Sequence, residues 1–169
     1  MKGKFVLVTL FVLVLDNLTK WIVSTAMDLN SSIEVIHGYV RLTYVRNFGV
    51  AFGFLKDPGS AWKPYLLAGL AVVAVVVILV YSCRMPLERV LLQVALAVTM
   101  GGILGNFTDR IMRGWVVDFI DLHIKDRFSW PTFNVADSAI TIGITMLFID
   151  ALKRRDPDVR HEEADSPQQ

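Results

Sequence analysis

Four long runs of apolar residues limit what this chain can fold into. They cover about residues 5–27, 64–81, 90–106 and 135–152. Each is long enough, or nearly so, for the roughly 17–25 residues that a helix needs to cross a bilayer. Backbone groups in hydrocarbon find no water, so such spans form helices whose N–H and C=O groups pair internally. We therefore predict a mainly α membrane protein with four transmembrane helices.

The composition agrees with this class and excludes others. Hydrophobic residues make up 54% of the 169, which exceeds the usual share in a soluble domain. The formal net charge is +1 and no dense basic patch occurs, so we expect no nucleic-acid partner. The single cysteine, Cys83, cannot form an internal disulfide, and we assign it no role. We predict one domain over residues 1–155 and a disordered cytoplasmic tail over residues 156–169, which lacks an apolar period.

The first apolar run has an alternative reading as a cleaved signal peptide. Lys2 and Lys4 precede it, and "STA" at residues 24–26 faintly resembles a cleavage site. The run also carries Asp16 and Lys20, which a signal peptide does not need, and three further spans follow. An uncleaved first helix is the better interpretation.

Orientation follows from lysine and arginine, which favour the cytoplasmic side in short connections. With four spans, three basic clusters share one side, so we predict that both termini are cytoplasmic. These clusters are Lys2 with Lys4, Arg84 with Arg89, and residues 153–155. The connections at about residues 28–63 and 108–134 are then extracytoplasmic. The first contains "YVRLTYV" (residues 39–45), whose alternation predicts a strand, and we expect a small β-sheet cradle there, between the first and second helices.

Polar residues gather at the outer ends of the third and fourth predicted helices. In "GGILGNFTDR", Asn106 and Arg110 share a helix face, and Asp109 lies one turn from Asn106. Asn134 and Asp137 share a face at the start of the fourth helix. Ionisable residues beside membrane helices are functional candidates. The competing explanations are a helix-end salt bridge for Asp109 or Arg110, an N-cap for Asn134, and a first-turn acid for Asp137.

Two further polar stretches have simpler structural explanations. Asp16 and Lys20 are spaced i, i+4, acid first, which favours a helical ion pair over catalysis. Asn47 and Gly49 lie in "RNFGVAFGF", where glycine allows close approach to a ligand and asparagine donates and accepts hydrogen bonds. A turn within a sheet explains that stretch equally well. On the third helix, Ala97, Gly101 and Gly105 form a stripe of small residues suited to close helix packing.

The sequence offers no metal or nucleophile motif. The three histidines, His37, His123 and His161, have no paired spacing, and no CxxC, HExxH or GxSxG sequence occurs. We predict no metal site and no cofactor. Carboxylates remain the best catalytic groups available.

Two carboxylates in a partly dry site share one proton, so one can activate water while the other polarises a carbonyl. Asp137 is one candidate. Asp118 and Asp121 in "VVDFID" are the others, and spacing alone does not choose between them.

Five sequence motifs then indicate a family. They are "DNLTK" (residues 16–20), "NFGVAFG" (47–53), "GNFTDR" (105–110), "VVDFI" (116–120) and "FNVADS" (133–138). In this order and across four spans, the chain resembles the bacterial lipoprotein signal peptidases, signal peptidase II. The resemblance implies a four-helix inner-membrane aspartic peptidase with a small extracytoplasmic sheet. It implies cleavage of prolipoproteins just before a cysteine that carries diacylglycerol.

The resemblance also implies roles for particular residues. The catalytic pair falls on Asp118 and Asp137, and Asp121 lies outside its motif. The substrate-binding or supporting positions are Asn47, Gly49, Asn106, Asp109, Arg110 and Asn134. Asp16 and Lys20 match a motif for which we expect a structural role. The implied partners are diacylglyceryl-prolipoproteins, membrane lipid and a globomycin-type cyclic peptide inhibitor, and we expect a monomer with its active site near the outer leaflet surface.

Two other functions fit intramembrane polar residues. One is a small proton- or ion-coupled carrier, although its charges would more often lie near the midplane, between internal repeats. The other is a non-catalytic assembly protein, which would tolerate Asp118→Asn and Asp137→Asn.

Overall fold

The computed structural model describes residues 2–49, 62–86, 88–125 and 128–155. Its helices are α1 (Lys2–Ala26), α2 (Lys63–Arg84), α3 (Val90–Arg113) and α4 (Val135–Arg155). All four are long and apolar enough to cross a membrane. Together with a small antiparallel sheet, they confirm the predicted fold class. The predicted tail over residues 156–169 lies outside the described residues.

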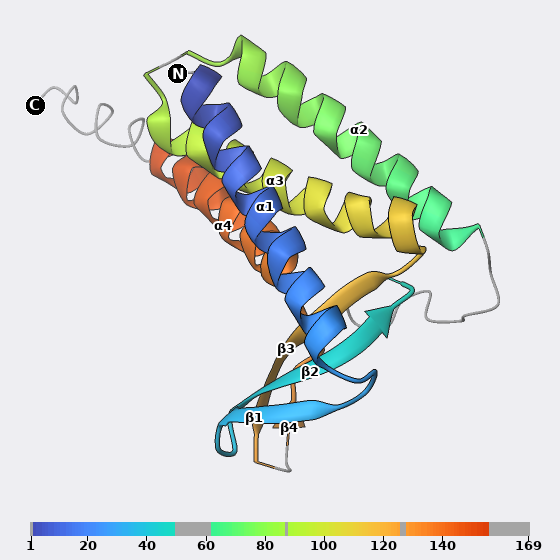
Figure 1. Cartoon of the computed structure of the whole chain (residues 1–169). Coiled ribbons are helices and arrows are strands. Elements are labelled where there is room, and N and C mark those ends of the chain that lie inside the picture. The colour runs from blue at the N-terminus through green and yellow to red at the C-terminus, as the bar shows by residue number, and fades with distance from the viewer. Residues whose placement is uncertain (1, 50–61, 87, 126–127, 156–169) are drawn as a thin grey trace, which may run out of the picture.

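The sheet draws its strands from both outer connections. Strands β1 (Ser32–Ile36) and β2 (Val40–Asn47) follow α1, whereas β3 (Val116–Ile124) and β4 (Phe128–Ser129) follow α3. They pair antiparallel in the order β1-β2-β3-β4. The sheet lies at one end of the helices, and the start of α1 and the end of α4 lie at the other end (Figure 1).

Helix α3 is the centre of the bundle. It packs against α1, α2 and α4, and it is the most buried of the four spans. It continues to Arg113, past the end of its apolar run, and ends where Gly114 adopts a left-handed φ of 80° and donates its N–H to the Arg110 carbonyl (3.1 Å). This extension keeps the polar residues of its last two turns on the helix.

Small residues let α3 approach its neighbours closely, as the predicted stripe requires. A Cβ on Gly101 would lie 2.6 Å from the Val12 Cβ on α1. A Cβ on Gly102, on the adjacent face, would lie 2.4 Å from the Ala136 carbonyl oxygen on α4. Without side chains at these positions, the backbones of three helices come close enough for short polar side chains to meet.

Candidate active site

Asp118 and Asp137 come from different elements and meet at one asparagine. Asp118 lies on β3 opposite Val45 of β2 and is buried, and Asp137 lies in the first turn of α4. The Asn134 side chain donates from Nδ2 to Asp118 Oδ1 (2.7 Å), and its backbone N–H donates to Asp137 Oδ2 (3.2 Å). One residue therefore holds a carboxylate on each side.

Two more asparagines complete the hydrogen bonding of these carboxylates. Asn47 Nδ2 donates to Asp118 Oδ2 (2.9 Å), and Asn106 Nδ2 donates to Asp137 Oδ1 (2.8 Å). Each aspartate thus accepts two hydrogen bonds from uncharged amides. We call Asp118 and Asp137 the aspartate pair.

Local structure explains why the start of α4 lies beside β3. Phe133 bridges to β3, since its carbonyl accepts the N–H of Phe119 (3.0 Å) and its N–H donates to the Ile120 carbonyl (3.0 Å). Asn134 then caps α4: its Oδ1 accepts the N–H of Asp137 (2.9 Å), while Asp137 accepts the N–H of Asn134. This is a reciprocal capping box. The N-cap role considered for Asn134 is therefore present. The same residue holds Asp137 through the cap and Asp118 through its side chain.

Burial has a large effect on the aspartate of β3. It raises the pKa of Asp118 from its ordinary value of 3.8 to about 7, and the negative charge of Asp137 acts in the same direction. The hydrogen bonds from Asn47 and Asn134 and the charge of Lys20 lower the pKa but do not cancel the rise. A carboxyl group with a pKa near 7 can hold or release a proton at neutral pH.

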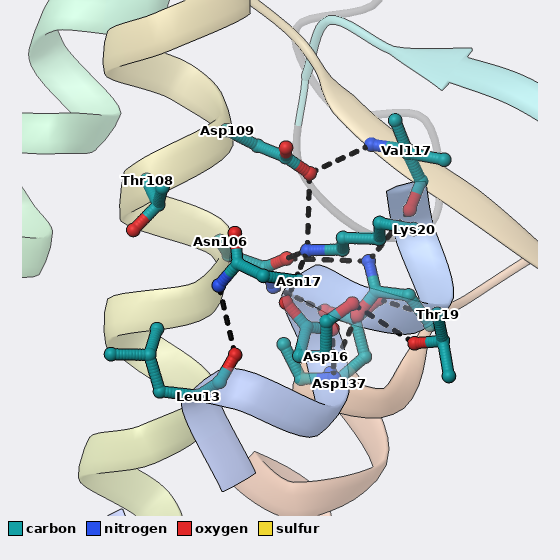
Figure 2. Close-up of polar contacts among 12 residues, drawn as sticks. Leu13, Asp16, Asn17, Thr19, Lys20, Asn106, Thr108, Asp109, Val117 and Asp137 are labelled. Atoms are coloured by element: carbon teal, nitrogen blue, oxygen red, sulfur yellow. Dashed lines mark hydrogen bonds and ion pairs between the residues drawn. The ribbon is translucent and has the colours of Figure 1, made fainter. Parts of the chain in front are cut away.

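A second buried group lies beside the pair. The ammonium of Lys20 contacts Asp16 Oδ2 (2.7 Å), Asn106 Oδ1 (2.9 Å) and Asp109 Oδ2 (3.1 Å) (Figure 2). Asp16, Lys20 and Asp109 form what we call the charge cluster. The predicted pair of Asp16 and Lys20 is present, and Asp109 joins it from α3.

The charge cluster also holds backbone. Asp16 Oδ1 accepts the N–H of Ala136 at the start of α4 (2.8 Å), and Asp109 Oδ2 accepts the N–H of Val117 on β3 (3.1 Å). The cluster therefore ties α1 and α3 to the two elements that carry the aspartate pair.

Arg110 and Gly49 support the site from the side of β2. The guanidinium of Arg110 donates to the carbonyls of Asn106 (3.2 Å) and Gly49 (3.2 Å). The N–H of Gly49 donates to Asn47 Oδ1 (2.9 Å), which leaves Asn47 Nδ2 directed at Asp118. The rest of the "NFGVAFG" stretch, from residue 50, lies outside the described residues.

Asp121 lies away from the pair. Side chains separated by three positions on a strand point to opposite faces, and Asp121 contacts Arg41, Thr43 and Ser129. The structure therefore brings Asp118, and not Asp121, together with Asp137.

A cavity of about 810 Å³ opens beside these residues, between α2, α3 and α4. Its polar end includes Asn47, Asn106, Arg110 and Asp137. Its apolar walls come from the helices and from the segment before α4, and include Leu70, Ala74, Ile103, Trp130, Phe133 and Ile140. The sequence did not single out these wall residues, because an apolar side chain that lines a cavity looks the same as one that faces lipid. Within the described ranges, no three His, Cys, Asp or Glu side chains group as a metal site.

Comparison with known proteins agrees with this arrangement. A lipoprotein signal peptidase of Alteromonas mediterranea is 39% identical over 163 residues, which cover 96% of this chain and 88% of the relative. One of Pseudomonas putida is 44% identical over 147 residues, 87% of this chain and 85% of the relative. A bacterial membrane enzyme structure at 2.3 Å resolution superposes with a TM-score of 0.83 and 31% identity over 99% of this chain and 94% of that one. Another at 1.9 Å gives a TM-score of 0.78 and 32% identity over 89% and 94%.

The family model described as "Signal peptidase (SPase) II" matches residues 8–153, which is most of the chain. The four spans, the sheet and the sequence identity lead to the same conclusion. This membrane protein belongs to the signal peptidase II family.

Proposed function

We propose that the protein is an aspartic endopeptidase that removes the signal peptide from diacylglyceryl-modified prolipoproteins. It cleaves the bond just before the lipidated cysteine, with water activated between Asp118 and Asp137. The observation that carries this proposal is the bridging by Asn134, which binds one carboxylate through its side chain and the other through its backbone.

The chemistry follows from one proton shared by two acids. Because the pKa of Asp118 is raised to about 7, we assign the proton to Asp118 and the role of the base to Asp137. Asp137 takes a proton from water, and the oxygen of that water attacks the scissile carbonyl. Asp118 donates its proton to the carbonyl oxygen as the tetrahedral intermediate forms. When the C–N bond breaks, the proton gained by Asp137 passes to the leaving amine of the cysteine. A hydroxyl group of the intermediate returns its proton to Asp118 as the new carboxyl group forms.

Asn47, Asn106 and Asn134 hold the two acids in place during these proton transfers. Their N–H groups have fixed directions, since each amide is bonded at both ends. Such preorganised dipoles lower the cost of moving charge in a site that water does not fill. Arg110 keeps Gly49, and with it Asn47, against α3.

The cavity fits a substrate that arrives from lipid. Apolar residues of α2, α3 and α4 line much of it, and Asn47, Asn106, Arg110 and Asp137 line it beside the aspartate pair. We place the protein in the bacterial inner membrane with both termini cytoplasmic and the aspartate pair near the outer leaflet surface. Lipid offers an acyl chain the same burial as the cavity does, at about 0.8 kcal/mol per CH₂. Discrimination therefore depends on the shape of the cavity and on polar contacts near the cysteine, and a globomycin-type cyclic peptide would compete for the same space.

The test is cleavage of a synthetic diacylglyceryl-prolipoprotein by purified protein in detergent, followed by mass spectrometry. We expect wild type to cut before the modified cysteine. We expect Asp118→Asn and Asp137→Asn to lose activity by about 10²–10⁴-fold or more, because each removes a proton-transfer group. The matched control is Asp121→Asn, which removes an aspartate from the same strand as Asp118 but from its other face, and it should cleave at close to the wild-type rate. Full activity in either variant of the pair would remove that residue from the chemistry.

A further inference from the structure

Lys20 does more than pair with an acid. Its side chain is 1% exposed, and its ammonium has three oxygen neighbours. Two are the carboxylates of Asp16 and Asp109, and the third is Asn106 Oδ1 at 2.9 Å. An ammonium has three N–H donors. Two of them face carboxylates, and the third faces the uncharged amide of Asn106, which also donates to Asp137.

This contact decides which way the Asn106 amide points. Lys20 can only donate, so the amide atom that faces it must be oxygen. Asn134 Nδ2 donates to the same oxygen (3.2 Å). The amide nitrogen of Asn106 must then face Asp137, to whose Oδ1 it donates at 2.8 Å. A reversed amide would place N–H groups against an ammonium and oxygen against a carboxylate.

We propose that Lys20 is a positioning residue for the cleavage reaction, which fixes the orientation of the Asn106 amide so that it donates to Asp137. This inference rests on the proposed function of the aspartate pair. Lys20 itself touches neither Asp118 nor Asp137 through a hydrogen bond in the described residues. It acts through Asn106, and a purely structural ion pair would not need that contact.

The charge of Lys20 provides a second route to the pair. It lowers the pKa of Asp118, against the stronger effect of burial. The charged groups around the ammonium are Asp16 on α1, Asp109 on α3, Asp118 on β3 and Asp137 on α4, with Arg110 and Arg113 further along α3. Loss of the positive charge therefore raises the pKa of Asp118 and moves the alkaline limb of the pH–rate profile to higher pH.

The test exchanges the ion pair for an amide pair, as Asp16→Asn with Lys20→Gln. The double variant removes one charge of each sign, so the net charge of the cluster is unchanged. Asn at position 16 can still accept the N–H of Ala136. The control is Lys4→Gln, the same change at an exposed position of α1. Thermal unfolding in detergent and steady-state cleavage over a range of pH are measured for each protein.

We expect the folded double variant to lose kcat by about tenfold to a hundredfold, since small displacements of reacting groups are that costly. KM should change less, and the alkaline limb should move to higher pH. Lys4→Gln should match wild type in every measurement. A folded double variant with wild-type kcat and pH profile would overturn the inference. That outcome differs from failure of the proposed function, in which wild type does not cleave or Asp118→Asn and Asp137→Asn remain active.

If the double variant does not fold, Lys20→Arg replaces it. Arginine keeps the charge that Asp16 and Asp109 need, but its rigid planar group cannot hold the three oxygens as an ammonium does. Lys20→Arg is measured alone and together with Asn106→Ala. A loss of kcat that is present in the wild-type background and disappears beside Asn106→Ala supports the inference. A loss that is equal in both backgrounds, or absent from both, overturns it.

Discussion

The structure places two pairs of aspartates side by side and compensates their charges in different ways. Asp16 and Asp109 flank the ammonium of Lys20 at 2.7 and 3.1 Å. Asp118 and Asp137 accept hydrogen bonds from the amides of three asparagines, none of which carries a charge. The residue type is the same, and Asp16, Asp109 and Asp118 are all buried whereas Asp137 is half-buried. The main difference between the two sets lies in their partners.

That difference fits the structural role expected for the charge cluster and the reactive role proposed for the aspartate pair. In the charge cluster a cation lies between two carboxylates and offsets part of their charge. Amides stabilise a carboxylate but do not cancel its charge, so the charges of Asp118 and Asp137, which contact the same asparagine, still repel each other. Burial raises the pKa of Asp118 to about 7, and the charge of Asp137 adds to this rise, so the aspartate pair can hold a proton at neutral pH. A mobile proton is what hydrolysis requires.

The largest expected effect comes from removing the cation. Lys20→Met leaves the buried Asp16 without the cation that it contacts, and leaves Asp109 with Arg113 alone, at 3.4 Å. Loss of one partner of a buried pair costs about 3–5 kcal/mol of unfolding free energy. We expect little folded protein, as judged by yield and by thermal unfolding in detergent. Lys4→Met, at an exposed position of the same helix, should behave as wild type. If Lys20→Met unfolded at the wild-type temperature, the cluster would not depend on charge compensation.

The opposite result is expected for the aspartate pair, where removing a charge should help stability. Because the pKa of Asp118 is raised, the native state binds this proton more tightly than the unfolded state. The resulting stabilisation is complete below about pH 4 and is lost as the pH rises to about 7. The pKa difference corresponds to at most about 4 kcal/mol. Asp118→Asn has no such titrating proton, so its free energy of unfolding should not show this decrease between about pH 4 and about pH 7.

The measurement is the melting temperature of wild type and Asp118→Asn in detergent between pH 4 and pH 8. The melting temperature of the variant should rise relative to that of wild type as the pH rises, even though we expect the variant to lose cleavage activity. Asp28→Asn, which changes an exposed aspartate, should keep the wild-type slope. Parallel curves for wild type and Asp118→Asn would mean that Asp118 does not hold the proton.

The sequence predicted the parts of the fold that lipid dictates. Four spans are required by four apolar runs, and the i, i+4 spacing of Asp16 and Lys20 predicted their ion pair. The sheet was only half predicted, because the polar residues of "VVDFIDLHI" do not recur at every second position, as they would in a strand with one polar face. Recognised as a strand, it places Asp118 and Asp121 on opposite faces. Only one of these two acids can then face Asp137, so recognising the strand would have left a single partner for it.

The polar network itself depends on contacts between distant parts of the chain. Asn106 is bonded to Lys20, 86 residues away, and to Asp137, 31 residues away. No local pattern encodes which of several asparagines and aspartates will meet across α1, α3 and α4. The family motifs contain these residues, but only the packing of the helices shows that Asn106 contacts both the charge cluster, through Lys20, and the aspartate pair, through Asp137.

The smallest expected effect tests that packing without changing any charge. In Gly105→Ala the added Cβ would lie 2.3 Å from Asp16 Oδ2, so the charge cluster must shift. Overpacking of this kind costs about 1–3 kcal/mol, and we expect a lower melting temperature in detergent.

Gly69→Ala is the matched control, since no atom lies within 4 Å of the new Cβ on this exposed face of α2. Alanine is favoured over glycine in a helix by about 1 kcal/mol, so this control should be neutral or slightly stabilising. An equal melting temperature for the two variants would show that Asp16 is not held against α3. If Gly105→Ala melts earlier but its pH–rate profile is that of wild type, the aspartate pair does not depend on the exact position of Asp16.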